Sequence, residues 1–85
     1  MAETNELTES DVRELLVAVG VSPPDAESGF DSSFEELGMD SLARLEIAGR
    51  LLDRFGITVD DELTPEETPA GIHRLVNLRL TGELA

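Results

Sequence analysis

The 85-residue sequence predicts an all-α protein, a small four-helix bundle with three longer helices, one short helix and a long ordered loop. Three observations support this fold class. Apolar residues recur at 3- and 4-residue steps in separate segments, residues typical of helix starts and stops flank those segments, and no stretch alternates long enough for a sheet. We expect a single domain over residues 1–85, because a chain of this length can bury only one modest core.

The first expected helix covers residues 9–19. Thr8 followed by Asp11 resembles a capping box in which Asp replaces the usual Glu. Gly20 can take the left-handed conformation that ends a helix. The apolar residues at helical spacing are Val12, Leu15, Leu16 and Val19.

Residues 20–40 are expected to form a loop, because prolines, a glycine and several serines interrupt any helical pattern. Loops of this length are usually functional or disordered, but apolar residues are spaced through this one. Burying even two such side chains, at ~1.5–3 kcal/mol each, would hold the loop against the helices. We therefore expect an ordered crossover anchored by Val21, Phe30, Phe34 and Leu37.

The longest helical pattern covers residues 41–55. Asp40 is a favourable N-cap residue, and Gly56 stands at the position where glycine often ends a helix. Most of this helix is apolar apart from one polar strip, so we expect it to be the central element of the bundle. The polar strip consists of Glu46, Arg50, Asp53 and Arg54.

Two further helices are expected after residue 56. A short one is predicted over residues 61–66, where Asp60, Asp61 or Thr64-Pro65 could start a helical turn. The last covers residues 69–80, with Thr68 as N-cap and Pro69 at the first helical position. Its apolar stripe consists of Ile72, Leu75, Val76 and Leu80.

The composition limits the classes of function. With 19 acidic and 6 basic residues the formal charge is −13, which opposes binding to nucleic acid or to an anionic membrane. The chain has no cysteine, so it has no disulfide, thiolate metal site or cysteine nucleophile. Acids occupy the first residues, where a secretory signal would be basic and then apolar. We expect a monomeric cytoplasmic protein with no membrane or nucleic-acid partner.

Two kinds of chemistry fit the sequence poorly. The segment DAESGFDSSFEE resembles a calcium loop, but Phe30 stands where the sharp turn requires glycine. Ser41, His73 and Asp40 are the residue types of a hydrolase triad, but GMDSL lacks the second glycine of a nucleophile elbow. A small helical chain also has little material for an oxyanion hole. We therefore expect no metal site and no catalysis by this chain.

Ser41 is the residue for which the sequence suggests a chemical role. Its hydroxyl stands at the first turn of a helix, where backbone N–H groups are unpaired and the helix dipole is positive. Such a position stabilises a phosphate, so a phosphodiester on Ser41 would be favoured there, with Asp40 helping to orient the reacting groups. The alternative is that Ser41 only shares helix capping with Asp40.

The motif GMDSL at residues 38–42 resembles the Asp-Ser-Leu motif of acyl carrier proteins, and the resemblance extends over residues 8–80. It implies a carrier in which Ser41, flanked by Asp40 and Leu42, receives 4′-phosphopantetheine from coenzyme A through a separate Mg-dependent transferase. Such a carrier holds acyl intermediates as thioesters and delivers them to partner enzymes. It catalyses nothing itself.

Within this family, DSLARLE followed by GRLLDRFGI is most similar to the discrete carriers of bacterial aromatic (type II) polyketide synthases. Carriers of fatty acid synthesis have mostly acids on the second helix, whereas this one has Arg44, Arg50 and Arg54. The implied partners are a phosphopantetheinyl transferase, a ketosynthase, an acyltransferase and tailoring enzymes. A fatty acid carrier, a peptidyl carrier, and an unmodified acidic adaptor that binds basic proteins are the alternatives.

The resemblance also implies a partner surface around Ser41 and along the second helix. Arg44 corresponds to a position at the entrance between the second and third helices, where it could narrow that entrance. Its guanidinium could reach a phosphodiester on Ser41 or the acids at 60–62, or it could be a solvated arginine with no role. The residues expected to contact partners are Met39, Leu42, Leu45, Glu46, Arg50 and Asp53.

Overall fold

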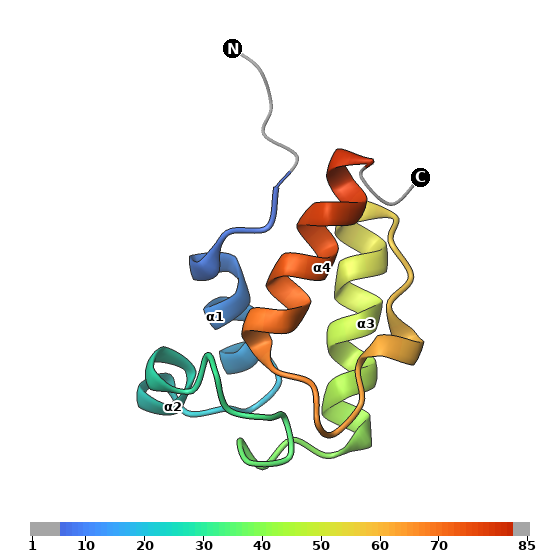
Figure 1. Cartoon of the computed structure of the whole chain (residues 1–85). Coiled ribbons are helices and arrows are strands. Elements are labelled where there is room, and N and C mark those ends of the chain that lie inside the picture. Colours follow the sequence, from blue (N-terminus) through green and yellow to red (C-terminus); the bar gives the residue numbers. More distant parts are fainter. Residues whose placement is uncertain (1–5, 83–85) are drawn as a thin grey trace.

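The computed structural model describes residues 6–82. No strand occurs among them, and the prediction of a small all-α bundle is confirmed. Figure 1 shows α3 and α4 running in the same direction and α1 running in the opposite direction. None of the helices in this part of the chain has the length and apolar character needed to cross a membrane. The elements are α1 (Glu9–Ala18), α2 (Pro23–Ser28), α3 (Ser41–Phe55), the 3-10 helix η1 (Asp60–Glu62) and α4 (Pro69–Thr81).

Helix α1 begins with the capping box expected from the sequence. The Thr8 hydroxyl accepts a hydrogen bond from the Asp11 backbone N–H at 3.0 Å, and the Asp11 carboxylate accepts one from the Thr8 N–H at 3.0 Å. Val12 and Leu16 are buried and face the core, where α1 packs against α2 and α4. Two reciprocal bonds thus satisfy backbone donors that the first turn would otherwise leave unpaired.

Helix α2 lies where the sequence predicted only loop, so that prediction is wrong for residues 23–28. Pro23 and Pro24 occupy the first two helical positions, where a missing N–H removes no helical hydrogen bond. Ala26 is buried and anchors the helix to the core. A short helix therefore precedes α3, in addition to the short helical element expected after it.

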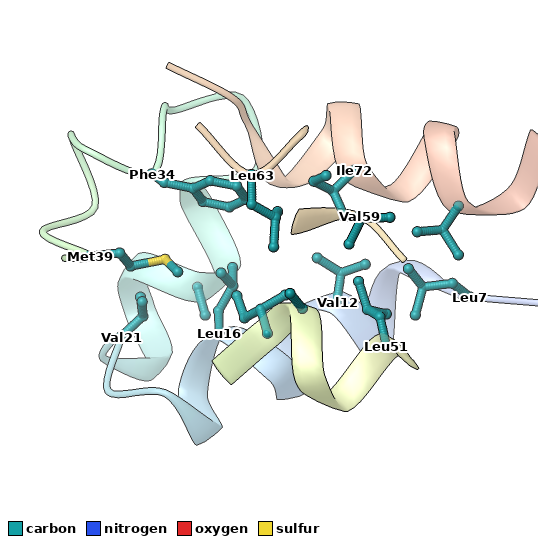
Figure 2. Close-up of a cluster of buried hydrophobic side chains, with 14 residues drawn as sticks. Leu7, Val12, Leu16, Val21, Phe34, Met39, Leu51, Val59, Leu63 and Ile72 are labelled. Carbon is teal, nitrogen blue, oxygen red and sulfur yellow. The ribbon is translucent and has the colours of Figure 1, made fainter. Parts of the chain in front are cut away.

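The rest of the crossover is ordered, as predicted. Phe34 is 1% exposed, and Figure 2 shows its ring and the Met39 side chain pointing into the hydrophobic cluster. The Phe34 N–H donates to the Glu67 carbonyl at 2.8 Å, and the Glu35 N–H donates to the Pro65 carbonyl at 3.0 Å. The crossover is thereby bonded to the segment that precedes α4.

The helix predicted over residues 61–66 is reduced to the single 3-10 turn η1 at Asp60–Glu62. Pro65 disfavours helical geometry at Thr64, the residue before it. The carbonyls of Pro65 and Glu67 accept hydrogen bonds from the crossover, which hold this segment in place without a helix. The steric effect of Pro65 therefore limits the helix to the single turn before Thr64.

Helices α3 and α4 begin at the expected residues. The Asp40 carboxylate accepts from the Ala43 N–H at 2.9 Å, and the Thr68 hydroxyl accepts from the Gly71 N–H at 2.9 Å. At the other end of α3, Gly56 has a φ of 73°, a left-handed conformation that favours glycine. The buried side chains of α3 are Ile47, Ala48 and Leu51, and those of α4 include Ile72 and Val76.

Candidate functional site

At the start of α3, helix capping and the free hydroxyl group belong to two different residues. Asp40 alone makes the cap, through the bond from its carboxylate to Ala43. Ser41 is the first residue of the helix and is exposed, and its hydroxyl makes no hydrogen bond within residues 6–82. The capping alternative for Ser41 therefore has no support in the structure, and the hydroxyl is free to react.

Packing before the helix holds this serine in place. Met39 is only 5% exposed and lies in the core cluster, so the residue two positions before Ser41 is anchored. Gly38 has a φ of 79° and turns the chain into α3. The Met39 side chain was expected to contact partners, but its burial removes it from any partner surface.

Arg44 follows Ser41 by one helical turn and is partly buried. Its Nη1 donates to the Met39 carbonyl at 3.3 Å, a long hydrogen bond. No carboxylate of residues 6–82 lies within 4.0 Å of the Arg44 guanidinium, and Glu62 pairs with Arg79 instead at 2.8 Å. The acids at 60–62 are thus not ion-paired with Arg44.

A cavity of about 240 Å³ adjoins Ser41, between α3 and the η1 segment. Figure 1 shows η1 beside α3. One wall of this cavity comes from α3 and includes Arg44, and the other comes from the η1 segment. Arg44 therefore lies between α3 and the η1 segment. The lining residues are Ser41, Arg44, Leu45, Ala48, Asp60 and Leu63.

The outer face of α3 combines apolar and charged side chains. Leu42 is 71% exposed and Leu45 is 58% exposed, and both were expected to contact partners. Glu46 and Arg50 form an ion pair at 2.9 Å across one helical turn. Leu52, 50% exposed, belongs to the same helix but was not singled out, although its spacing of seven residues from Leu45 could have indicated it.

The remaining charged residues of this face lie toward the end of α3. Asp53 is exposed, as a partner-contacting residue would be. Arg54 pairs at 3.3 Å with Asp11 of α1 and contacts the Phe55 ring, its guanidinium 5.0 Å from the ring centroid. The Thr8 backbone hydrogen bond, together with Arg54, holds the pKa of Asp11 below 3.8. Through Arg54, the polar strip of α3 thus contacts α1.

The structure does not assemble the other chemistries considered. His73 packs edge-on against Phe30, with ring centroids 6.0 Å apart, in a cavity that Ser41 does not line. Asp25 lies inside α2, and the Glu36 carboxylate accepts from the Ser33 backbone N–H. Within residues 6–82 no group of three or more histidine or acidic side chains is placed to hold a metal ion.

Comparison with known families identifies the class of protein. Residues 10–71 match the family described as "Phosphopantetheine attachment site", a match that includes all of α3 and Ser41. This span is more than half of the chain, so the chain belongs to that family. Its members bear a covalently attached 4′-phosphopantetheine group.

Similar proteins place the chain more narrowly, among acyl carrier proteins. It is 37% identical over 75 residues to the actinorhodin polyketide synthase acyl carrier protein of Streptomyces coelicolor, covering 84% of this chain and 87% of that protein. It is 39% identical over 75 residues to the granaticin polyketide synthase acyl carrier protein of Streptomyces violaceoruber, covering 84% and 88%. No solved structure matches the chain at a significant level.

Proposed function

We propose that this chain carries acyl and polyketide intermediates as thioesters on a 4′-phosphopantetheine attached to Ser41, and delivers them to the enzymes of a polyketide synthase. The observation that carries the proposal is the exposure and the hydrogen bonding of Ser41. In a family defined by phosphopantetheine attachment, Ser41 is an exposed serine at the start of α3 whose hydroxyl makes no hydrogen bond within residues 6–82.

The residues at the start of α3 fit this group. The Ala43 N–H is occupied by the Asp40 carboxylate and the Arg44 N–H by the Asp40 carbonyl, but the N–H groups of Ser41 and Leu42 have no partner within residues 6–82. Unpaired N–H groups and the positive end of the helix dipole stabilise a phosphodiester. The bound group supplies a terminal thiol on a flexible arm, and the chain has no cysteine of its own to do this.

We further propose that the chain is not an enzyme. Ser41 has no hydrogen-bonded base, because its hydroxyl makes no hydrogen bond within residues 6–82 and His73 lines a different cavity. A serine without an adjacent base is a weak nucleophile on its own. Attachment therefore requires a separate phosphopantetheinyl transferase, and the chemistry on the acyl chain requires the synthase enzymes.

The proposed partner surface is the exposed face of α3. Its apolar centre consists of Leu42, Leu45 and Leu52, and the Glu46–Arg50 pair lies beside it. Apolar side chains surrounded by charges are typical of surfaces that bind other proteins. We propose that a ketosynthase, an acyltransferase and tailoring enzymes bind here, adjacent to Ser41, and that the carrier works as a monomer.

Two observations favour polyketide synthesis over fatty acid synthesis. Both similar proteins described above are named as polyketide synthase carriers. In addition, α3 carries Arg44, Arg50 and Arg54 alongside only two acids, so its surface is not uniformly acidic. A partner enzyme would have to present acidic groups as well as basic ones to this helix.

The attachment is tested by incubating the chain with coenzyme A, Mg²⁺ and a broad-specificity phosphopantetheinyl transferase, then measuring intact mass. Wild type and a control variant, Ser10→Ala, should each gain one phosphopantetheine, and Ser41→Ala should gain none. Ser10 is a matched control because it is also exposed in the first turn of a helix. A gain on Ser41→Ala, or none on wild type, rejects the assignment.

The pathway is tested with the malonyl-loaded carrier and two ketosynthases, one from a type II polyketide synthase and one from bacterial fatty acid synthesis. Faster condensation with the polyketide enzyme supports the proposal. Faster condensation with the fatty acid enzyme contradicts it, even if Ser41 is modified.

A further inference from the structure

The cavity beside Ser41 has two walls that are held by different contacts. Ser41, Arg44 and Ala48 line it from α3, whose position is set by buried Ile47 and Leu51. Asp60 and Leu63 line it from the η1 segment. This second wall is fixed from outside by Arg79, which donates to the Thr58 carbonyl at 2.7 Å and to Glu62 at 2.8 Å.

Arg44 is chemically unusual among the arginines. Four of the six, Arg13, Arg50, Arg54 and Arg79, have a carboxylate of residues 6–82 within 4.0 Å, and Arg44 and Arg74 do not. The guanidinium of Arg44 has one hydrogen bond, the 3.3 Å bond from Nη1 to the Met39 carbonyl. Because a guanidinium has five N–H donors and this bond uses one, the other donors of Arg44 have no partner within residues 6–82 and can bind a ligand.

We propose, on the basis of the proposed function, that Arg44 selects the acyl group held in this cavity. It favours a short acyl chain with a neutral 3-oxo group over a saturated chain of equal length. The 3-oxo oxygen can accept a hydrogen bond from the guanidinium. A saturated chain would displace water from the same N–H groups and return no hydrogen bond.

The opposite wall and the volume of the cavity further limit which acyl groups it can hold. Asp60 lines the opposite wall, and its carboxylate would repel a second carboxylate such as that of a malonyl group. The volume of about 240 Å³ is smaller than the roughly 300–1,000 Å³ of cavities that enclose drug-sized ligands. A chain of a few carbons fits this space, and the rest of a longer chain extends outside it.

The test compares 3-oxobutanoyl and butanoyl groups, which have equal carbon number. Each is loaded on ¹⁵N-labelled protein from its coenzyme A thioester, and amide shifts are measured relative to the carrier bearing phosphopantetheine alone. The reporters are the amides of Ala48 and Leu63, which line the cavity. In wild type, both amides should shift more with 3-oxobutanoyl than with butanoyl.

Arg44→Met is the decisive variant, because Met keeps an apolar, unbranched side chain and removes the donors. In this variant the order should reverse, with butanoyl giving the larger shifts. Arg74→Met removes the same charge outside this cavity and should behave like wild type. Equal shifts for the two groups in wild type, or the wild-type order preserved in Arg44→Met, would overturn the inference.

Intact mass separates this result from failure of the proposed function. If the chain is not loaded at Ser41, both the function and the inference are rejected. If loading is complete but the two acyl groups give the same shifts, only the selection by Arg44 is rejected.

Discussion

Replacing Phe34 with alanine should remove much of the stability of this fold. The ring is 1% exposed and lies in the main hydrophobic cluster, where it joins the crossover to the rest of the core (Figure 2). Truncating a fully buried Phe to Ala costs about 3–5 kcal/mol, from lost apolar burial and the cavity that remains. At ~0.05–0.15 kcal/mol per residue, the whole 85-residue chain has about 4–13 kcal/mol of stability. The variant should therefore lose between about a quarter of this stability and all of it.

Urea unfolding followed by far-UV circular dichroism measures this effect, since the chain has no Trp or Tyr to report by fluorescence. Phe30→Ala is the matched control. Its ring is only partly buried and contacts His73 and the Arg13 guanidinium, each about 6.0 Å from the ring centroid. Its loss should be clearly smaller. If Phe34→Ala loses less than about 1.5 kcal/mol, or no more than Phe30→Ala, the crossover is not anchored by the Phe34 ring.

Three further predictions concern hydrogen bonding, pH and salt. Asn77→Ala should lower the free energy of unfolding by about 2–4 kcal/mol, because the Asn77 side-chain amide accepts a hydrogen bond from the N–H of buried Leu7 at 2.8 Å and donates one to the Leu7 carbonyl at 2.9 Å. A loss below ~1 kcal/mol in urea unfolding would contradict this. The pKa of Asp11 is lowered below 3.8 by the Thr8 backbone N–H and by Arg54, so its ionised form stabilises the fold above pH 3.8 and that contribution is lost as the pH falls through the lowered value. The stability difference between wild type and Asp11→Asn should accordingly shrink below pH 3.8 in urea unfolding at a series of pH values, and a constant difference would refute the reasoning. Finally, raising ionic strength from about 0.01 to 0.15 M, which shortens the screening length from ~30 to ~8 Å, should raise the Tm of a chain with a charge of −13, and an unchanged Tm would show that its charges are already balanced.

The accuracy of the sequence-based helix predictions depended on how local each signal was. Helix α3 was predicted with both ends correct, because Asp40 and Gly56 act on the residues next to them. Helix α2 was missed because a Pro-Pro pair is compatible both with a loop and with the first turn of a helix. The burial of Ala26 in the core favours the helix. The predicted helix over 61–66 was too long, because Pro65 disfavours helical geometry at the residue before it. The segment is instead held by hydrogen bonds to the crossover, about thirty residues earlier in the chain.

The features of the candidate site also divide into those set by neighbouring residues and those set by tertiary contacts. The sequence by itself determined that Ser41 starts a helix capped by Asp40, since a cap involves residues only three positions apart. Only the tertiary structure decided that Met39 is buried and that the Ser41 hydroxyl makes no hydrogen bond within residues 6–82. It also decided that Arg44 shares a cavity with Asp60 and Leu63, and that Arg79 holds the far wall of that cavity. These contacts join residues about 16 to 21 positions apart, and periodicity along one helix does not specify how a second segment packs against it.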